Sequence, residues 1–113
     1  MPSISTHVLN SENGTHVAGL TVTLTYIEPG GGRKKIFSNK TDAGGRLVQN
    51  FDFSLTSNEI FEIEFKLSDI HNKKKGIYCN DIIFRVSLSS DNEKFHIPII
   101  VSQHGASTWW SGE

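Results

Sequence analysis

Apolar and polar side chains alternate along several stretches of this chain. In residues 20–26, four apolar or aromatic side chains fall on one face and three threonines on the other. A period of two is the pattern of a β-strand that buries one face, whereas a helix repeats every 3.6 residues. The chain is therefore predicted to be all-β. The same alternation marks residues 61–67, 82–88 and 95–101.

Shorter candidate strands and turn-forming residues fill the rest of the chain. Turns are expected where glycine, asparagine and aspartate cluster, because these residues adopt positive φ angles or bond their own backbone. Seven or eight strands in 113 residues predict a two-sheet β-sandwich, formed as a single domain over residues 1–113. Residues Ser68 to Lys75 begin with a capping pattern and predict one short helix. The further strands are expected at residues 4–9, 35–40, 47–53 and 107–110.

Composition and charge exclude several kinds of partner. Hydrophobic residues make up 36% of the chain and charged residues 20%, as in a globular protein. The net charge of −1 gives no field that would attract nucleic acid or an anionic membrane. No apolar run approaches the ~20 residues of a membrane span. The basic runs Arg33–Lys35 and Lys73–Lys75 lie beside turn residues and are expected in solvated loops and not in a phosphate-binding patch.

The single cysteine, Cys79, bears on the compartment. One cysteine forms no internal disulfide, so nothing points to an oxidising environment. No charged residue or histidine adjoins it, and a buried, unreactive thiol is expected. The first residues lack the charged and apolar regions of a secretory signal. A cytoplasmic location is expected, with a peroxisomal one left open although Ser111–Glu113 is not a peroxisomal tripeptide.

Two of the five histidines stand in the middle of predicted strands. His7 lies within residues 4–9, and His96 lies on the face opposite the apolar stripe of residues 95–101. A polar side chain in such a place faces water or a lined cavity. Pro98 lacks a ladder donor and indicates an edge strand or a break in pairing, which would leave His96 accessible. Spacing alone leaves both a packing and a catalytic role open, and it shows no metal-ligand pattern.

Three segments of the chain resemble the transthyretin-related family, and within it the 5-hydroxyisourate hydrolases. They occur in the family's order, with similar spacing, and together they span most of the chain. The resemblance therefore implies a transthyretin-like sandwich. The segments are Ser5–Asn10 followed by Gly14-Thr15 and Ala18-Gly19, then Thr41–Leu47, then Phe95–Ile99 continuing through Ser102 and Gly105 to Ser107-Thr108.

The resemblance also implies an activity and its residues. Carried over from the family, the catalytic set is His7, Arg46 and His96. The family's hydrolases open 5-hydroxyisourate with water in purine metabolism, use no metal or organic cofactor, and form homotetramers with sites at a subunit interface. The residue types suit that chemistry, because a histidine exchanges protons near neutral pH and an arginine holds an anionic oxygen with two donors.

The C-terminal tail departs from the family's pattern. The hydrolases end in Tyr-Arg-Gly-Ser, whereas Trp109 and Trp110 stand at the first two of these positions here. Because the family's tail lines the pocket, Trp109, Ser111 and Gly112 are the expected substrate-binding residues. An indole donates a hydrogen bond but accepts none through its ring nitrogen, unlike a phenol. Smaller departures are His16 in place of a proline, Gly44 in place of an aspartate, and the segment Tyr78–Ile82.

Three functions follow from this resemblance. The first is a 5-hydroxyisourate hydrolase-like enzyme. The second is a diverged relative that hydrolyses, isomerises or cyclises a larger or more apolar substrate in a secondary-metabolite pathway. The third is a non-enzymatic binding protein of the transthyretin type, which ranks last because the family's carriers lack the histidine–arginine set and are secreted.

Overall fold

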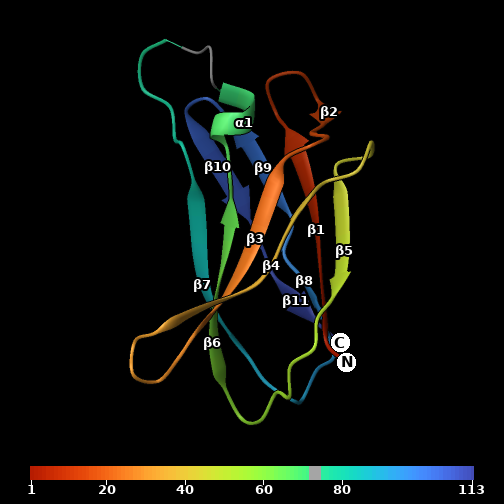
Figure 1. Ribbon diagram of the computed structural model, residues 1–113. Helices are drawn as coiled ribbons and strands as arrows, with labels where there is room; N and C mark the ends of the chain where they lie inside the picture. The colour runs from red at the N-terminus through yellow and green to blue at the C-terminus, as the bar shows by residue number, and fades with distance from the viewer. Residues whose placement is uncertain (72–74) are drawn as a thin grey trace.

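The computed structural model describes residues 1–71 and 75–113. Within these residues the chain forms eleven strands and one short helix (Figure 1). Both termini lie at one end of the molecule, and α1 lies at the other. The elements are β1 (Ser3–Asn10), β2 (Thr15–His16), β3 (Thr21–Ile27), β4 (Arg33–Lys40), β5 (Arg46–Asn50), β6 (Glu59–Phe65), α1 (Ser68–His71), β7 (Ile82–Leu88), β8 (Lys94–His96), β9 (Ile99–Ser102), β10 (Gly105–Thr108) and β11 (Ser111–Gly112).

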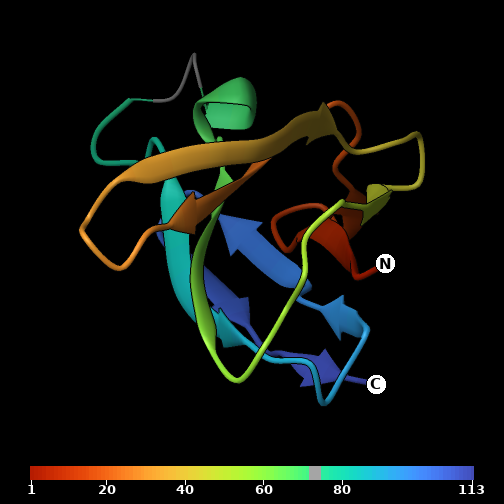
Figure 2. The same cartoon turned by 60° about the horizontal axis from the view of Figure 1, so that its bottom comes forward.

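The strands form two sheets that pack face to face (Figures 1 and 2). One sheet has the order β4-β3-β6-β7, with every neighbouring pair antiparallel. The other is centred on β1, with the order β10-β9-β1-β8-β11 and with β2 and β5 also paired to β1. Strand β1 runs parallel to β8 and β9 and antiparallel to β5. The predicted all-β, two-sheet sandwich with one short helix is thus confirmed.

Several predicted elements have different bounds in the structure. The stripe at residues 95–101 is divided at Ile97–Pro98 into β8 and β9, because proline offers no ladder donor. The predicted break in pairing is therefore present, but the edge position is wrong, since β8 lies between β1 and β11. The helix ends at His71, and the part of the predicted segment at residues 72–74 lies outside the described residues.

The core lies between the sheets and is built from the alternating stripes. Phe61 is fully buried and contacts the rings of Phe51 and Phe53 edge-on, with centroids 5.9 and 5.1 Å apart. Burying a side chain of this size stabilises the fold by about 1.5–3 kcal/mol. The apolar core consists of Ile4, Val8, Val17, Leu20, Val22, Leu24, Leu47, Phe51, Phe61, Ile63, Phe65, Leu67, Leu88, Phe95, Ile97, Ile99 and Val101.

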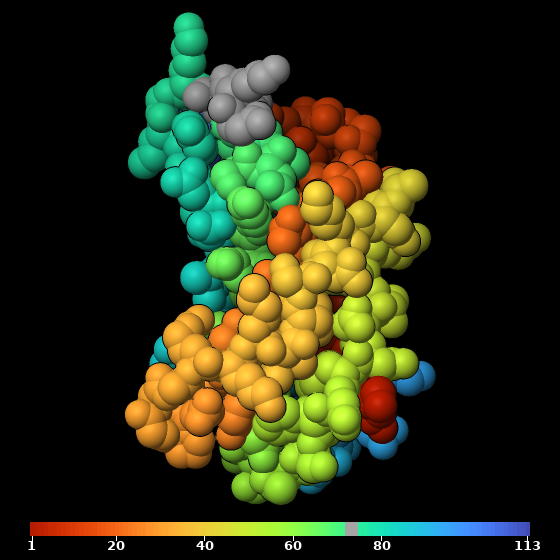
Figure 3. Space-filling view, viewed as in Figure 1, coloured from red at the N-terminus to blue at the C-terminus, as the bar shows by residue number. Residues whose placement is uncertain are grey.

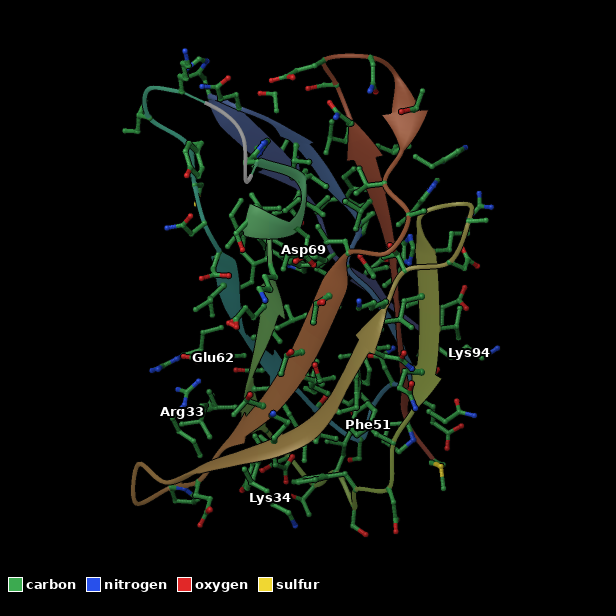
Figure 4. All side chains as sticks on the ribbon, turned by 45° about the horizontal axis from the view of Figure 1, so that its top comes forward. Arg33, Lys34, Phe51, Glu62, Asp69 and Lys94 are labelled. Carbon is green, nitrogen blue, oxygen red and sulfur yellow. The ribbon has the colours of Figure 1, made fainter. Side chains whose placement is uncertain are left out.

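The outer face of the four-stranded sheet carries an ion-pair network. Glu62 lies beside Arg33 (Figure 4) and accepts a hydrogen bond from it at 2.6 Å. It accepts another from Arg85 at 2.8 Å, and the two arginines lower the pKa of its carboxyl. The basic run Arg33–Lys35 is therefore not in a loop as expected but on the edge strand β4, which crosses the face shown in Figure 3. Charged side chains on such an edge discourage pairing with other chains.

Cys79 is exposed, so the expectation of a buried thiol was wrong. It lies between α1 and β7, outside the strands, where no sheet covers it. With Ile77 and Tyr78 it lines a largely apolar hollow of about 420 Å³ beside the β9–β10 turn. Among the described residues, no helix is long and apolar enough to cross a membrane.

Candidate active site

His7 and Arg46 lie directly opposite each other on the neighbouring strands β1 and β5. Along β1 the even-numbered residues 4, 6 and 8 are buried, so the odd-numbered residues face outward. Thr6 fixes this register, because its hydroxyl donates a buried hydrogen bond of 2.6 Å to the carbonyl of Ile97. His7 and Arg46 therefore share the outer face of the β1-centred sheet.

His96 reaches the same face from the other side of β1. It pairs with Ser5 in the parallel register between β1 and β8. Its neighbours Phe95 and Ile97 are buried, so the His96 ring points outward. Its Nδ1 lies 2.7 Å from the Ser5 hydroxyl. Since Ser5 and His7 are two positions apart on one strand, the structure brings all three sequence-predicted residues, His7, Arg46 and His96, onto one surface.

A tight turn positions Arg46 against β1. The Asp42 carboxylate accepts hydrogen bonds of 2.9 Å from the backbone N–H groups of Gly44 and Arg46, which lower its pKa. Gly45 has φ +74°, and a Cβ there would lie 2.6 Å from the carbonyl oxygen of Val8. Only glycine fits this close approach to β1, which aligns the start of β5 with His7.

His16 is the residue of this site that sequence reasoning left without a role. Its Nδ1 lies 2.9 Å from Nε2 of His7, and the two rings lie nearly parallel with centroids 5.0 Å apart. The contact arises because β2 folds back on β1 and pairs His16 with Leu9. The Asn13-Gly14 turn signal and the departure from the family's proline marked this position, but neither indicated a contact with His7.

The surroundings of His7 lower its pKa. Desolvation is the largest cause, followed by the charge of Arg46 and the contribution of His16, with a smaller one from His96. A hydrogen bond between the His7 ring and the Gly44 backbone works in the opposite direction. The lowered pKa favours the neutral ring of His7, in which one nitrogen carries a proton and the other a lone pair.

A hollow of about 300 Å³ opens beside His96, and residues of the C-terminal tail form part of its wall. Strand β11 pairs with β8 and sets Ser111 opposite His96. Gly112 also lines this hollow, and a Cβ on it would lie 3.1 Å from the Asn92 side chain, which would have to shift to admit a larger residue. The hollow is lined by Ser5, Lys94, Phe95, His96, Ser111, Gly112 and Glu113.

The two tryptophans lie on the exposed bend between β10 and β11. Trp109 is 49% exposed and is not among the residues that line the hollow beside His96. Trp110 is 70% exposed and lines a different hollow with Val86 and Leu88 of β7. The expected role of Trp109 in substrate binding therefore stays a prediction.

The other histidines lie away from this face. His71 is buried at the end of α1, and His104 is exposed in the turn between β9 and β10. Among residues 1–71 and 75–113, no three histidine, cysteine, aspartate or glutamate side chains are grouped so that they could hold a metal ion. The site thus offers three imidazoles, a guanidinium and serine hydroxyls on an open sheet face.

This sandwich, with paired histidine and arginine side chains on the outer face of one sheet, matches a known family. The family model described as the HIUase/Transthyretin family matches residues 4–111. The chain belongs to this family, as its sequence motifs predicted.

Individual relatives agree with that assignment. The 5-hydroxyisourate hydrolase of Halalkalibacterium halodurans is 29% identical over 94% of each chain. Among solved structures, transthyretin from Sparus aurata has a TM-score of 0.82 at 14% identity, covering 97% of each chain. The 5-hydroxyisourate hydrolase of Klebsiella pneumoniae has a TM-score of 0.78 at 20% identity, covering 99% of this chain and all of that one (100%). These structural likenesses confirm the transthyretin-like fold.

Proposed function

We propose that this protein is a 5-hydroxyisourate hydrolase-like enzyme that opens a small oxidised heterocycle with water. The observation that carries the proposal is the placement of His7, Arg46 and His96 on one outer sheet face. The relatives named 5-hydroxyisourate hydrolase support it, since they match nearly the whole chain. A carrier needs no such set of proton-transfer groups, so the enzyme is favoured over a binding protein.

The proposed chemistry uses proton transfer and charge stabilisation alone. When His96 Nδ1–H donates to Ser5 at 2.7 Å, its Nε2 lone pair is free to take a proton from water. The oxygen of that water bonds to a carbonyl carbon of the substrate, and Arg46 holds the oxygen on which negative charge develops. The ring C–N bond then breaks, and the proton on His96 passes to the leaving nitrogen. These steps require no metal or organic cofactor.

We also propose a homotetramer of single-domain subunits in which a second copy covers the site. The site lies on an open sheet face beside Val48, whose side chain is 70% exposed. Strands β7 and β10 end their sheets, each with a single partner strand among the described elements. Backbone groups along such edges are available to pair with another copy.

The altered tail supports a second candidate, a diverged relative with a larger or more apolar substrate. Trp109 and Trp110 replace the family's tyrosine and arginine beside the β8–β11 pair that carries His96 and Ser111. In this account Trp109, Ser111 and Gly112 contact the substrate, and the indole stacks on it. A substrate with an apolar ring would then be turned over better than 5-hydroxyisourate.

One assay tests the proposal and separates the two candidates. The protein is mixed with freshly generated 5-hydroxyisourate, and the loss of its absorbance is compared with spontaneous decay. We expect an acceleration, and a further gain when the tail after Thr108 is changed to Tyr-Arg-Gly-Ser, at matched protein concentrations. No acceleration by either protein would contradict the hydrolase proposal. A fast natural protein with no gain from the restored tail would contradict the second candidate.

A further inference from the structure

The hydrogen bonds of His7 define which of its nitrogens carries the proton. The bond to Gly44 favours the protonated ring, so the ring donates and the Gly44 carbonyl accepts. Nε2 of His7 already contacts His16 at 2.9 Å, which leaves Nδ1–H as the donor to Gly44. In the neutral ring Nε2 then carries the lone pair. In this tautomer of His7, His16 supplies the proton of the 2.9 Å contact through its own Nδ1–H.

This arrangement leaves the opposite end of His16 open. A neutral imidazole with Nδ1–H has a lone pair at Nε2. The His16 side chain is exposed, whereas His7 is half-buried and both its nitrogens are engaged. The outward end of the pair is thus His16 and not His7.

We propose that His16 fixes the tautomer of His7 and completes the active site as the outer member of a two-histidine proton relay. His16 Nε2 takes the second proton of the attacking water, the one that His96 does not take, and the Nδ1–H proton of His16 passes to Nε2 of His7. One proton enters and one moves inward, so the pair gains a single positive charge. The reverse transfer then releases a proton to solvent and restores the neutral pair. This role rests on the proposed hydrolase function, and it extends the catalytic set beyond His7, Arg46 and His96.

The charges around the pair favour the uptake of a single additional proton. Arg46 lies opposite His7 on β5, and His96, which lies opposite Ser5 on β8, adds a smaller electrostatic contribution. Asp42, in the turn before β5, is an acidic group whose carboxylate interacts weakly with the charge of His7. A second proton on His16 would place two imidazolium rings in contact beside Arg46, which costs free energy.

The backbone holds His16 in place for this contact. Val17 N donates to the carbonyl of Val8 at 3.0 Å, and the register sets His16 opposite Leu9. A Cβ added to Gly45 would lie only 3.1 Å from the Cβ of His16, so the two residues pack closely. The same glycine therefore positions both Arg46 and His16 around His7.

The first test is nitrogen NMR of the substrate-free protein labelled at histidine, which needs no turnover. We expect the Nδ1–H tautomer of His7 in the natural protein and in His16→Asn, whose amide still donates to Nε2. In His16→Ala we expect mixed tautomers and a rise in the His7 pKa toward its ordinary value. An Nε2–H tautomer in the natural protein, or unchanged His7 signals in His16→Ala, would overturn the proposal.

The second test is the rate on 5-hydroxyisourate as a function of pH. An asparagine holds His7 but relays no proton, so kcat should fall about tenfold or more in both variants. The acidic limb of the profile should move to higher pH in His16→Ala. If His16→Asn keeps the full rate, there is no relay. If the natural protein has no turnover while its tautomer is as expected, the hydrolase proposal fails and the His7–His16 pairing stands.

Discussion

At the scale of single residues, the lowered pKa of His7 makes the stability of the fold depend on pH. Below about pH 6.5, its ordinary value, the unfolded chain binds a proton that native His7 does not bind. The contribution of His7 is therefore complete above this pH and is lost as the pH falls through the lower native pKa. Urea unfolding at pH 8, 6.5 and 5 should show a midpoint that falls with pH.

A variant isolates the contribution of His7 to this pH dependence. His7→Gln keeps a polar side chain on the same face but removes the titrating ring. Its unfolding midpoint should fall less between pH 6.5 and 5 than that of the natural protein. The carboxyl groups of Glu62 and Asp42, whose pKa values are also lowered, titrate at lower pH and contribute equally to the pH dependence of both proteins. Equal slopes in the two proteins would contradict the account.

The sequence predicted some residues of the site and missed another for a physical reason. His7 and His96 stood out because each is a histidine in the middle of a predicted strand, and the family resemblance suggested their role. His16 did not stand out, because its strand has two residues, too few for any alternation to appear. Its contact with His7 depends on how β2 folds back, which is a property of the turn geometry.

At the scale of elements, the Asp42–Arg46 turn is the part of the site most sensitive to substitution. In Gly45→Ala a Cβ would meet the Val8 carbonyl at 2.6 Å in a backbone with φ +74°. The left-handed conformation alone costs about 1–2 kcal/mol, and the collision adds to it. The free energy of unfolding should fall by about 2–4 kcal/mol, with a loss of turnover as Arg46 is displaced.

The neighbouring glycine provides the matched control. A Cβ at Gly44 would meet nothing closer than Asp42 Oδ1 at 3.5 Å, and its φ is not in the left-handed region. Gly44→Ala should therefore change the free energy of unfolding by less than about 0.5 kcal/mol. Chemical denaturation of both variants measures the difference. An equally stable Gly45→Ala would show that the turn does not hold β5 against β1.

The sequence predicted the bounds of an element correctly where the alternation was long and uninterrupted. The prediction was wrong where the chain bends. The stripe at residues 82–88 is β7 without change, whereas that at residues 95–101 is split by Pro98. The parallel pairing of β1 with β8 and β9 joins residues about ninety positions apart. A local pattern carries no information on such a pairing, so the order of strands in the sheet had to come from the structure.

At the scale of the whole molecule, the open site face predicts association. Light scattering should give about four times the chain mass of 12.6 kDa. Val48→Lys, on the outer face of the sheet that carries the site, should lower this mass, because a charge would be buried between copies. Ile77→Lys is the matched control, since Ile77 is 79% exposed in the segment between α1 and β7, outside both sheets. A monomer with full activity would contradict the shared-site account.

The most direct measurement compares the rate of 5-hydroxyisourate loss for the natural protein, Arg46→Ala and His96→Ala. Arg46 is exposed and His96 half-buried, both on the outer sheet face, so these truncations should leave the unfolding midpoint nearly unchanged. The account predicts acceleration by the natural protein and a loss of about a hundredfold or more in each variant, because a proton acceptor or an oxyanion contact is removed. Folded variants that keep near-normal turnover would contradict the assignment of this face as the active site.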